Sequence, residues 1–150
     1  MTNPALPSAL AVFDAINSRD LSRLDDLVTA DFVDHGSPFP LTPGPEGYRR
    51  ILTFVTGVLQ VRYDVEDVIE TADRVVLRAL AHGVGVDAVH GDGAAGRSYA
   101  MATVHIYRTE GDRLAEHWGV RDELGVLIHL GVLPAPQLDL AVAPAAGSAG

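Results

Sequence analysis

The residue whose type and position point most directly to chemistry is Asp122, at the end of a predicted strand. Val120 and Trp118 share its parity, so a period-two strand places all three side chains on one face. A carboxylate buried beside an indole and an aliphatic side chain loses hydration, which raises the pKa of the carboxyl group toward neutrality. Such a carboxyl group can act as a general acid or base. We therefore expect Asp122 to be a catalytic residue.

The same aspartate has a structural interpretation, as the N-cap of a helix that begins at Glu123. Aspartate is common at helix N-caps, where its carboxylate accepts a backbone N–H. Hydrogen bonds to the charged form lower the pKa of a carboxyl group, which is the opposite of what a general acid needs. From the residues alone, capping and catalysis both remain open for Asp122.

His105 is the second candidate for acid–base chemistry. It lies on a predicted strand on which Met101, Thr103 and Tyr107 share its face. From a neighbouring strand its imidazole could face Asp122, orient that carboxylate, or hydrogen-bond a substrate oxygen. The alternative is a structural histidine bonded to a backbone carbonyl.

Two further histidines are expected in different places. His35 ends the segment 31–35 (DFVDH), where it could bind a substrate carbonyl or hydroxyl, or else face solvent. His117 and Arg121 have the opposite parity to Asp122. We therefore expect both on the outer face of the sheet, which a second subunit could cover.

Several aromatic side chains and one more histidine are candidates for the walls of a pocket around a flat or polycyclic ligand. Aromatic residues at such spacing are more often simply part of the core, so each has a structural alternative. With His35, the candidate substrate-binding residues are Phe13, Tyr48, His82, Tyr99 and Trp118.

The composition excludes several classes of function. The net charge is −9 and the sequence pI is about 4.9, which argues against nucleic acid or an anionic membrane as the main partner. All 11 basic residues are arginine, so neither a Schiff-base lysine nor a P-loop lysine exists. The absence of cysteine excludes disulfides and thiolate metal sites.

Other motifs that carry chemistry are also missing. Six histidines invite a metal site, but no H-E-x-x-H or similar ligand spacing occurs, and a metal-free pocket is favoured. There is no G-x-S-x-G elbow for a serine nucleophile. Gly83-Val84-Gly85 lies inside a predicted strand, where glycines help a sheet to bend and do not form a dinucleotide-binding turn.

The elements that must position these side chains follow from hydrophobic periodicity. Leu6, Leu10, Phe13 and Ile16 recur at helical spacing, a second short helix follows Asp20, and a third begins at Pro45. From Val61 the period changes to two, which predicts strands over about 61–66, 74–90, 98–108 and 113–121. Short turns between them predict an antiparallel, curved, four-stranded sheet. Three helices before such a sheet make an α+β fold, with the helices covering one sheet face.

The segment from Glu116 to Pro134 has a family resemblance. With the residues before it, it reads GDRLAEHWGVRDELGVLIHLGVLP. Supporting motifs are DFVDH, PGPEGYRR, ADRVVLR and VHIYR. Together they resemble the SnoaL-like branch of the superfamily that includes nuclear transport factor 2 and ketosteroid isomerase, over roughly residues 8 to 134.

The resemblance implies a cone-shaped α+β barrel in which a concave sheet and helices enclose one pocket. Members include polyketide ester cyclases that perform an intramolecular aldol closure, and related hydroxylases. In the cyclases an aspartate at the position of Asp122 acts as acid and base, with no metal or organic cofactor. Homodimers are common in the family.

The leading hypothesis is a cofactor-independent acid/base cyclase acting on an apolar, oxygenated, polyketide-type metabolite, with Asp122 and His105 as catalytic residues. One alternative is another reaction in the same pocket: hydroxylation, epoxide opening, dehydration or isomerisation. The other is a non-catalytic ligand-binding or dimerisation module. We expect one domain over residues 1–134 and a flexible tail over 135–150. No signal peptide or membrane-spanning run is seen, so a cytoplasmic protein is expected.

Overall fold

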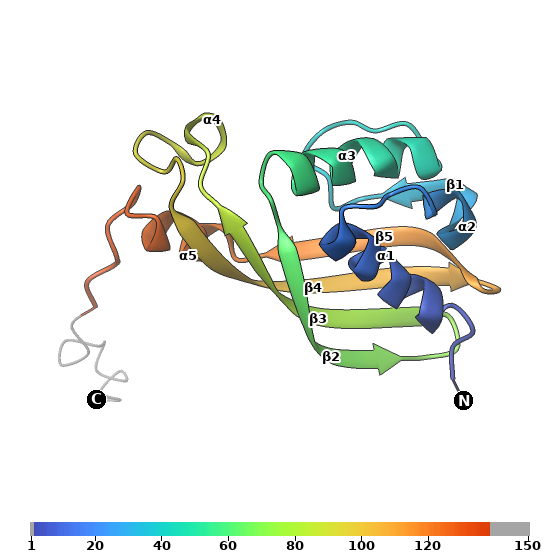
Figure 1. The fold of residues 1–150 in the computed structure, drawn as a ribbon. Helices are drawn as coiled ribbons and strands as arrows, with labels where there is room; N and C mark the ends of the chain where they lie inside the picture. The colour runs from blue at the N-terminus through green and yellow to red at the C-terminus, as the bar shows by residue number, and fades with distance from the viewer. Residues whose placement is uncertain (1, 139–150) are drawn as a thin grey trace, which may run out of the picture.

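The computed structural model describes residues 2–138 and shows helices packed on one face of a curved sheet (Figure 1). The sheet has five strands in the order β1-β5-β4-β3-β2, and it is not closed into a barrel. The predicted α+β class is confirmed, and the strand count is five instead of four. The strands are β1 (Val28–Asp34), β2 (Arg62–Glu70), β3 (Arg74–Val84), β4 (Ser98–Glu110) and β5 (Arg113–Arg121).

The additional strand is β1, which contains most of the extended segment 31–35. It pairs in parallel with β5, and this register sets Asp34 directly beside His117. The other neighbours in the sheet are antiparallel, as the short turns between them require. The parallel pair is possible because the long connection from β1 through α3 and the meander returns the chain to the sheet in the same direction.

Three helices precede the meander, as the periodicity predicts. They are α1 (Leu6–Ser18), α2 (Leu24–Leu27) and α3 (Pro45–Gly57), and two short helices follow, α4 (Asp87–His90) and α5 (Glu123–His129). Proline near the first turn of α1 and α3 has no N–H to leave unpaired. Helix α1 is capped at its C-terminus by Arg19, whose backbone is left-handed (φ 62°).

The long strand predicted over 74–90 is wrong in its second half, because β3 ends at Val84 and α4 follows. The physical reason lies at Gly85. A Cβ there would come within 2.0 Å of the Ala94 carbonyl oxygen, so the returning loop lies against a backbone that has no room for a side chain. The chain between β3 and β4 therefore folds back as a compact loop that contains α4.

The core lies between the helices and the inner face of the sheet. Along β3 and β4 the odd-numbered residues are buried and the even-numbered residues face outward. The inner residues of these strands include Val75, Leu77, Ala79 and Ala81 on β3, and Met101, Thr103, His105 and Tyr107 on β4. Buried side chains of α1, including Val12, Phe13 and Ile16, belong to the same core.

No helix within residues 2–138 has the length and apolar character that a membrane crossing requires. The predicted tail lies beyond residue 138 for most of its length, outside the described residues.

Candidate functional site

The side chains of β5 alternate as predicted, but the prediction of which face points inward is wrong. His117 is buried at 3% exposure, whereas Val120 is 71% exposed. The cause is the register with β4: Tyr107 pairs with His117 and His105 pairs with Gly119, so the inner face of β4 continues into His117, Gly119 and Arg121.

Asp122 lies on the exposed side and begins α5. Its Oδ1 accepts a hydrogen bond from the Gly125 N–H at 2.9 Å, so the predicted N-cap is confirmed. A Cβ at Gly125 would lie 2.2 Å from Asp122 Oδ2, and glycine makes room for the capping carboxylate. The expected burial of Asp122 in an apolar wall is wrong, because the residue is exposed. Its catalytic role stays a prediction.

A buried chain of polar side chains takes the central place on the inner face. Asp34 Oδ1 lies 2.7 Å from His117 Nδ1, and His117 Nε2 lies 2.9 Å from His105 Nδ1. At the far end His105 Nε2 lies 3.1 Å from the Thr103 hydroxyl, which donates to the Ala79 carbonyl at 2.7 Å. These residues come from β1, β5, β4 and β3, so the sheet register assembles the chain.

The hydrogen bonds of this chain fix where its protons lie. Because Thr103 donates its hydroxyl proton to a carbonyl, it must accept from His105 Nε2–H. The other nitrogen of His105 therefore accepts a proton from His117 Nε2–H. Asp34 and the Nδ1 of His117 then share one proton, which gives either a carboxylate with an imidazolium or two neutral groups.

Electrostatics favour the carboxylate form of Asp34. Burial alone raises the pKa of Asp34, but the hydrogen bond and charge of His117 outweigh it and hold that pKa below its ordinary value. Burial lowers the pKa of His105 well below the ordinary histidine value, and the nearby positive His117 and Arg121 act in the same direction. His105 is therefore neutral, and the Asp34 carboxylate faces His117 Nδ1.

Two residues predicted to line a pocket, Tyr48 and Phe13, pack around these hydrogen-bonded side chains. Tyr48 donates to or accepts from the Tyr107 hydroxyl at 2.8 Å, and both rings lie beside His117. Phe13 packs edge-on against His105, with ring centroids 5.0 Å apart. Both predicted residues are nearly fully buried, at 3% for Tyr48 and 2% for Phe13, and neither lines the cavity described next.

The cavity lies between α3, the α4 loop and the inner ends of the strands, and has a volume of about 140 Å³. Most of its wall is apolar and comes from α3, the segment after it, β4 and the loop that follows β1. The apolar lining includes Phe39, Ile51, Phe54, Val55, Leu59 and Met101. Its polar lining residues are Tyr63, His90, Tyr99, Arg121 and Glu123.

The polar groups of the cavity are mainly hydrogen-bond donors. Burial raises the pKa of Tyr63, with the positive charge of Arg121 opposing the rise. Burial raises the pKa of Tyr99 to about 12, with Glu123 adding to the rise, so both phenols stay protonated near neutrality. The Arg121 guanidinium donates to the Gly36 carbonyl at 3.1 Å, and within residues 2–138 no carboxylate lies at ion-pair distance from it.

His90 adds a further donor. Its Nδ1 accepts the Val86 N–H at 3.0 Å, so in the neutral ring the proton lies on Nε2. Glu123 is the cavity's carboxylate, placed at the rim by the first turn of α5. The cavity therefore combines one acceptor that can take a proton with several donors that can hold an oxygen.

Two other predicted substrate-binding residues meet on the opposite side of the sheet. The His35 and Trp118 rings are stacked, with centroids 4.9 Å apart and an angle of 13° between the planes. His35 Nε2 also contacts Glu116 Oε1 at 3.0 Å. Neither ring lines the cavity, because Trp118 shares the outward parity of Val120.

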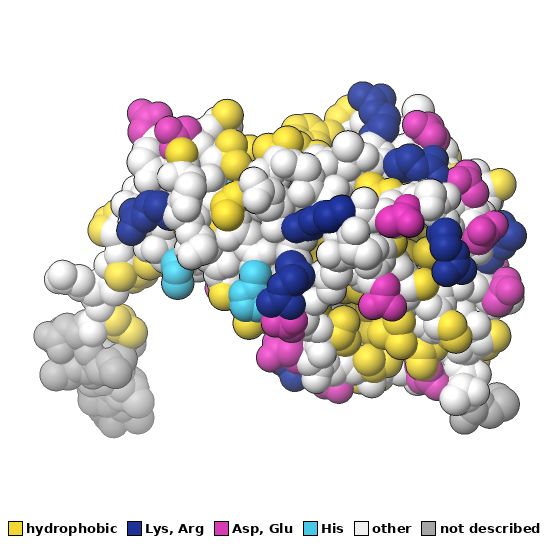
Figure 2. Space-filling view, in the orientation of Figure 1, with side chains coloured by type: hydrophobic (Ala, Val, Ile, Leu, Met, Phe, Trp, Pro, Cys, Tyr) yellow, Lys and Arg dark blue, Asp and Glu magenta, His cyan; other side chains and the backbone are white. Residues whose placement is uncertain are grey.

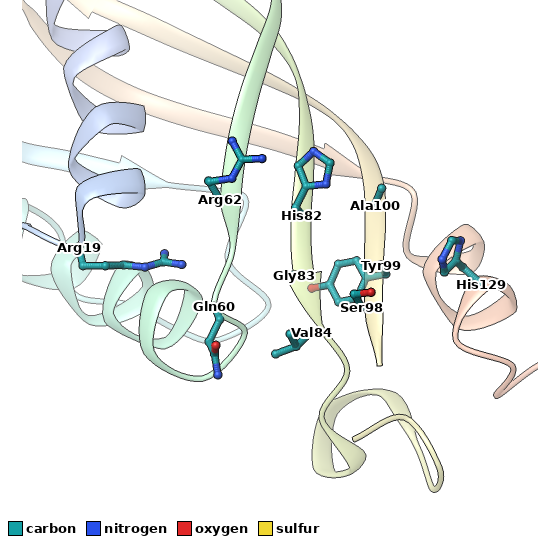
Figure 3. Close-up of a pocket in the computed structure, with 10 residues that line it drawn as sticks. All are labelled: Arg19, Gln60, Arg62, His82, Gly83, Val84, Ser98, Tyr99, Ala100 and His129. Atoms are coloured by element: carbon teal, nitrogen blue, oxygen red, sulfur yellow. The ribbon is translucent and has the colours of Figure 1, made fainter. Parts of the chain in front are cut away.

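The remaining predicted residues, His82 and Tyr99, line a second and larger hollow of about 500 Å³ near the start of β2, which we call the basic groove (Figure 3). Tyr99 lines both this groove and the cavity. The polar side chains of the groove are Arg19, Gln60, Arg62, His82, Ser98, Tyr99 and His129.

Sequence reasoning missed the cavity residues Arg121, Glu123 and Tyr63, and the partnership of Asp34 with His117. One signal was available. Gly119 separates His117 from Arg121 on one face of β5, and a Cβ there would lie 3.2 Å from His117 Cε1 and 3.6 Å from Arg121 Nη2. A glycine between two large polar side chains in a strand is consistent with a crowded inner face.

Comparison with known proteins agrees on the family and the fold. The sequence profile of the SnoaL-like polyketide cyclase family matches residues 8–130. IdmH from Streptomyces antibioticus is 28% identical, with a TM-score of 0.71 over 87% of this chain and 99% of its own. TsrD from Streptomyces laurentii is 25% identical, with a TM-score of 0.72 over 87% and 96%.

A SnoaL-like polyketide cyclase from Agrobacterium tumefaciens shares the fold at 22% identity, with a TM-score of 0.73 over 87% of this chain and all (100%) of its own. No match was found among the curated proteins.

Proposed function

This chain belongs to the SnoaL-like polyketide cyclase family, and from that premise we propose that it closes a ring by acid–base chemistry in the cavity between α3 and the sheet. The substrate is a small, mostly apolar molecule that carries at least two carbonyl oxygens. One carbonyl activates a neighbouring carbon for proton removal, and the other accepts the new carbon–carbon bond. The chemistry needs no cofactor.

The observation that carries this proposal is the composition of the cavity wall. Apolar side chains line the cavity together with Arg121, Tyr63 and Tyr99, and the exposed residue Glu123 lies at its rim. Donors fixed in an enclosed, poorly hydrated site stabilise an oxygen on which negative charge develops. An enolate is such a species, and the apolar walls fold the chain of the substrate into a reactive geometry.

Each polar residue has a role in this mechanism. Glu123 removes a proton from the activated carbon, while Arg121 and Tyr63 hold the enolate oxygen. The enolate carbon attacks the second carbonyl, and one carbon–carbon bond forms as the C=O π bond opens to an alkoxide. Glu123 returns its proton to that alkoxide, so the step consumes no other reactant.

His105 takes part through its neighbours in this proposal. Both of its ring nitrogens are occupied by His117 and Thr103, so it does not offer a free nitrogen to a substrate. It keeps His117 oriented toward Asp34, and His117 lies on the other side of Gly119 from Arg121. His105 and Asp34 are thus positioning residues that order the inner wall beside Arg121.

The test is proton exchange, which reports enolate formation without knowledge of the final ring. The protein is incubated in D₂O with a panel of linear β-diketones and β-keto esters, and deuterium at the activated carbon is followed by NMR. Arg121→Gln should lower the catalysed rate by about 10²–10³, the range for loss of one oxyanion donor.

The matched control is Arg113→Gln, which removes the same charge from an exposed position at the start of β5. Equal rates for the two variants, with ring closure intact, would overturn the role of Arg121.

The protein acts as a homodimer in this proposal, through the outer face of the sheet. Side chains of β3, β4 and β5 form an apolar area there, which we call the outer patch. Its members are Val76, Leu80, Val104, Ile106, Trp118 and Val120. Burying such an area against a second copy removes apolar surface from water.

A further inference from the structure

The basic groove reverses the charge of the rest of the molecule. The chain as a whole carries a net charge of −9, yet Arg19, Arg62, His82 and His129 line the groove, and the one carboxylate paired with these side chains is that of Asp64, which is not a lining residue. Figure 2 shows a histidine beside an arginine side chain near the middle of this face, with acidic side chains directly below them. A concave surface with one sign of charge raises the local concentration of the opposite ion.

Arg19 is held in place by its own backbone and by the chain opposite. Its Nη1 donates to the carbonyls of Ile16 and Val61, at 3.1 and 2.5 Å. Arg19 and Gln60 both have left-handed backbones, with φ of 62° and 52°, and they are the non-glycine residues of this kind within residues 2–138. Such conformations are costly, and structures tend to retain them at functional sites. Both residues line the groove (Figure 3).

The carboxylate of Asp64 already pairs with two of the groove residues. Asp64 accepts from Arg62 Nη1 at 2.6 Å and lies 2.9 Å from His82 Nε2. All three side chains are between 38% and 54% exposed, so the pairs are screened by water and exchange partners at little cost. An incoming anion with more oxygens than a carboxylate can replace Asp64 and also reach Arg19.

Tyr99 connects the groove with the cavity. Its hydroxyl end lies against the backbone of Gly83, where a Cβ would come within 2.5 Å of the Tyr99 oxygen. Figure 3 shows the ring between Gly83 and Ser98, directed across the sheet. Because the same ring lines both hollows, a ligand at Tyr99 can place one end in the groove and the other in the cavity.

We propose that the basic groove binds a phosphate group and that the ligand's apolar body enters the cavity past Tyr99. The substrate class is therefore a phosphate ester of an apolar, carbonyl-bearing molecule. The inference rests on the proposed function for the identity of the cavity, and the phosphate site itself stands on the groove. Phosphate suits the arrangement because guanidinium groups bind its several oxygens with paired hydrogen bonds, and histidines add further donors.

The experiment is an NMR titration of the isotope-labelled full chain at constant ionic strength, with two probes, inorganic phosphate and phenyl phosphate. Inorganic phosphate should shift the amides of His82 and Ala100 only. Phenyl phosphate should also shift the Met101 methyl signal, because its ring reaches the cavity, and should bind at least threefold more tightly. Chloride at equal ionic strength should shift none of these signals.

Three substitutions test the groove residues. Arg19→Gln and Arg62→Gln should each raise the Kd for inorganic phosphate about tenfold, the effect of losing one charge-assisted contact. Asp64→Asn should lower it severalfold, because the competing carboxylate is gone. The matched control is Arg74→Gln, at the other end of the sheet and paired with Asp73, which should leave the Kd unchanged.

Equal weakening by Arg62→Gln and Arg74→Gln would overturn the site, since it would show attraction by net charge alone. Phenyl phosphate that shifts the groove but not Met101 would overturn the connection to the cavity. Normal deuterium exchange in a protein that binds no phosphate would overturn this inference and leave the proposed function standing. Phosphate binding without deuterium exchange on any ketone would overturn the proposed function and leave the phosphate site standing.

Discussion

At the scale of single residues, the burial of His105 determines how the free energy of unfolding changes with pH. It is buried at 3% exposure, and both of its nitrogens are used by His117 and Thr103. Burial lowers the pKa of His105 well below the value in an unfolded chain. Below about pH 6.5 the unfolded state therefore binds a proton at this histidine that the native state does not.

The native state should thus lose stability as the pH falls below about 6.5. Replacing His105 by glutamine should reduce the slope of unfolding free energy against pH by up to about 1.4 kcal/mol per pH unit, the value for one proton. The measurement is urea denaturation between pH 5.0 and 7.5 at fixed ionic strength. The control is His129→Gln, at an exposed position on α5. An unchanged slope in the His105 variant would show that the native state takes up this proton.

At the scale of elements, Asp122 links the end of β5 to the start of α5. The helix has seven residues, and Asp122 Oδ1 satisfies the Gly125 N–H at its first turn. Asp122→Ala should lower the free energy of unfolding by about 1 kcal/mol, whereas Asp122→Ser should restore most of it, because serine also caps helices well. Urea denaturation measures both. Equal stability of the alanine and serine variants would contradict the capping role.

Strand β5 also shows what the sequence could and could not predict. Periodicity correctly grouped Trp118 and Val120 with Asp122, because side chains alternate in any strand. It could not tell which group faces the core. The more apolar group was expected inside, but Asp34, which is far away in the chain, satisfies His117 and makes a polar inner face possible.

Among the other elements, those that depend on short-range patterns were predicted well and those that depend on distant contacts were not. The first three helices, the turns between the strands and the family motif are short-range patterns, and they fit the structure. The end of β3 depends on the loop that returns to Gly85, and the pairing of β1 with β5 joins segments about 80 residues apart. The cavity depends on both, and local sequence therefore pointed to Tyr99 but not to Arg121 or Glu123 among its lining residues, while a binding role for Tyr99 stays a prediction.

At the scale of the whole molecule, the outer patch should hold two copies together. Val120 is 71% exposed on the described chain and lies near the C-terminal end of β5, on the same outward face as Trp118. Val120→Asp should convert a dimer into a monomer, because burying an unpaired carboxylate is costly. Light scattering after size-exclusion chromatography measures the mass. Val58→Asp, at the exposed end of α3, is the control and should stay dimeric. A wild-type monomer at all concentrations would refute the dimer.

The whole fold also gives two adjacent carboxylates different places. Helix α5 begins between them: Asp122 turns outward to cap it, and Glu123 lines the cavity. A general base that touches the reacting carbon contributes about 10²–10⁴ in rate. The two isosteric amide variants therefore separate the cavity mechanism from the role first predicted for Asp122.

The most direct measurement is the deuterium-exchange rate of β-diketones with Glu123→Gln and Asp122→Asn, alongside unfolding free energies for both. We expect Glu123→Gln to lose at least about 10²-fold in rate while Asp122→Asn, which still caps α5, keeps most of it. The opposite result, with Asp122→Asn inactive and Glu123→Gln active at normal stability, would contradict the proposed mechanism and assign catalysis to Asp122.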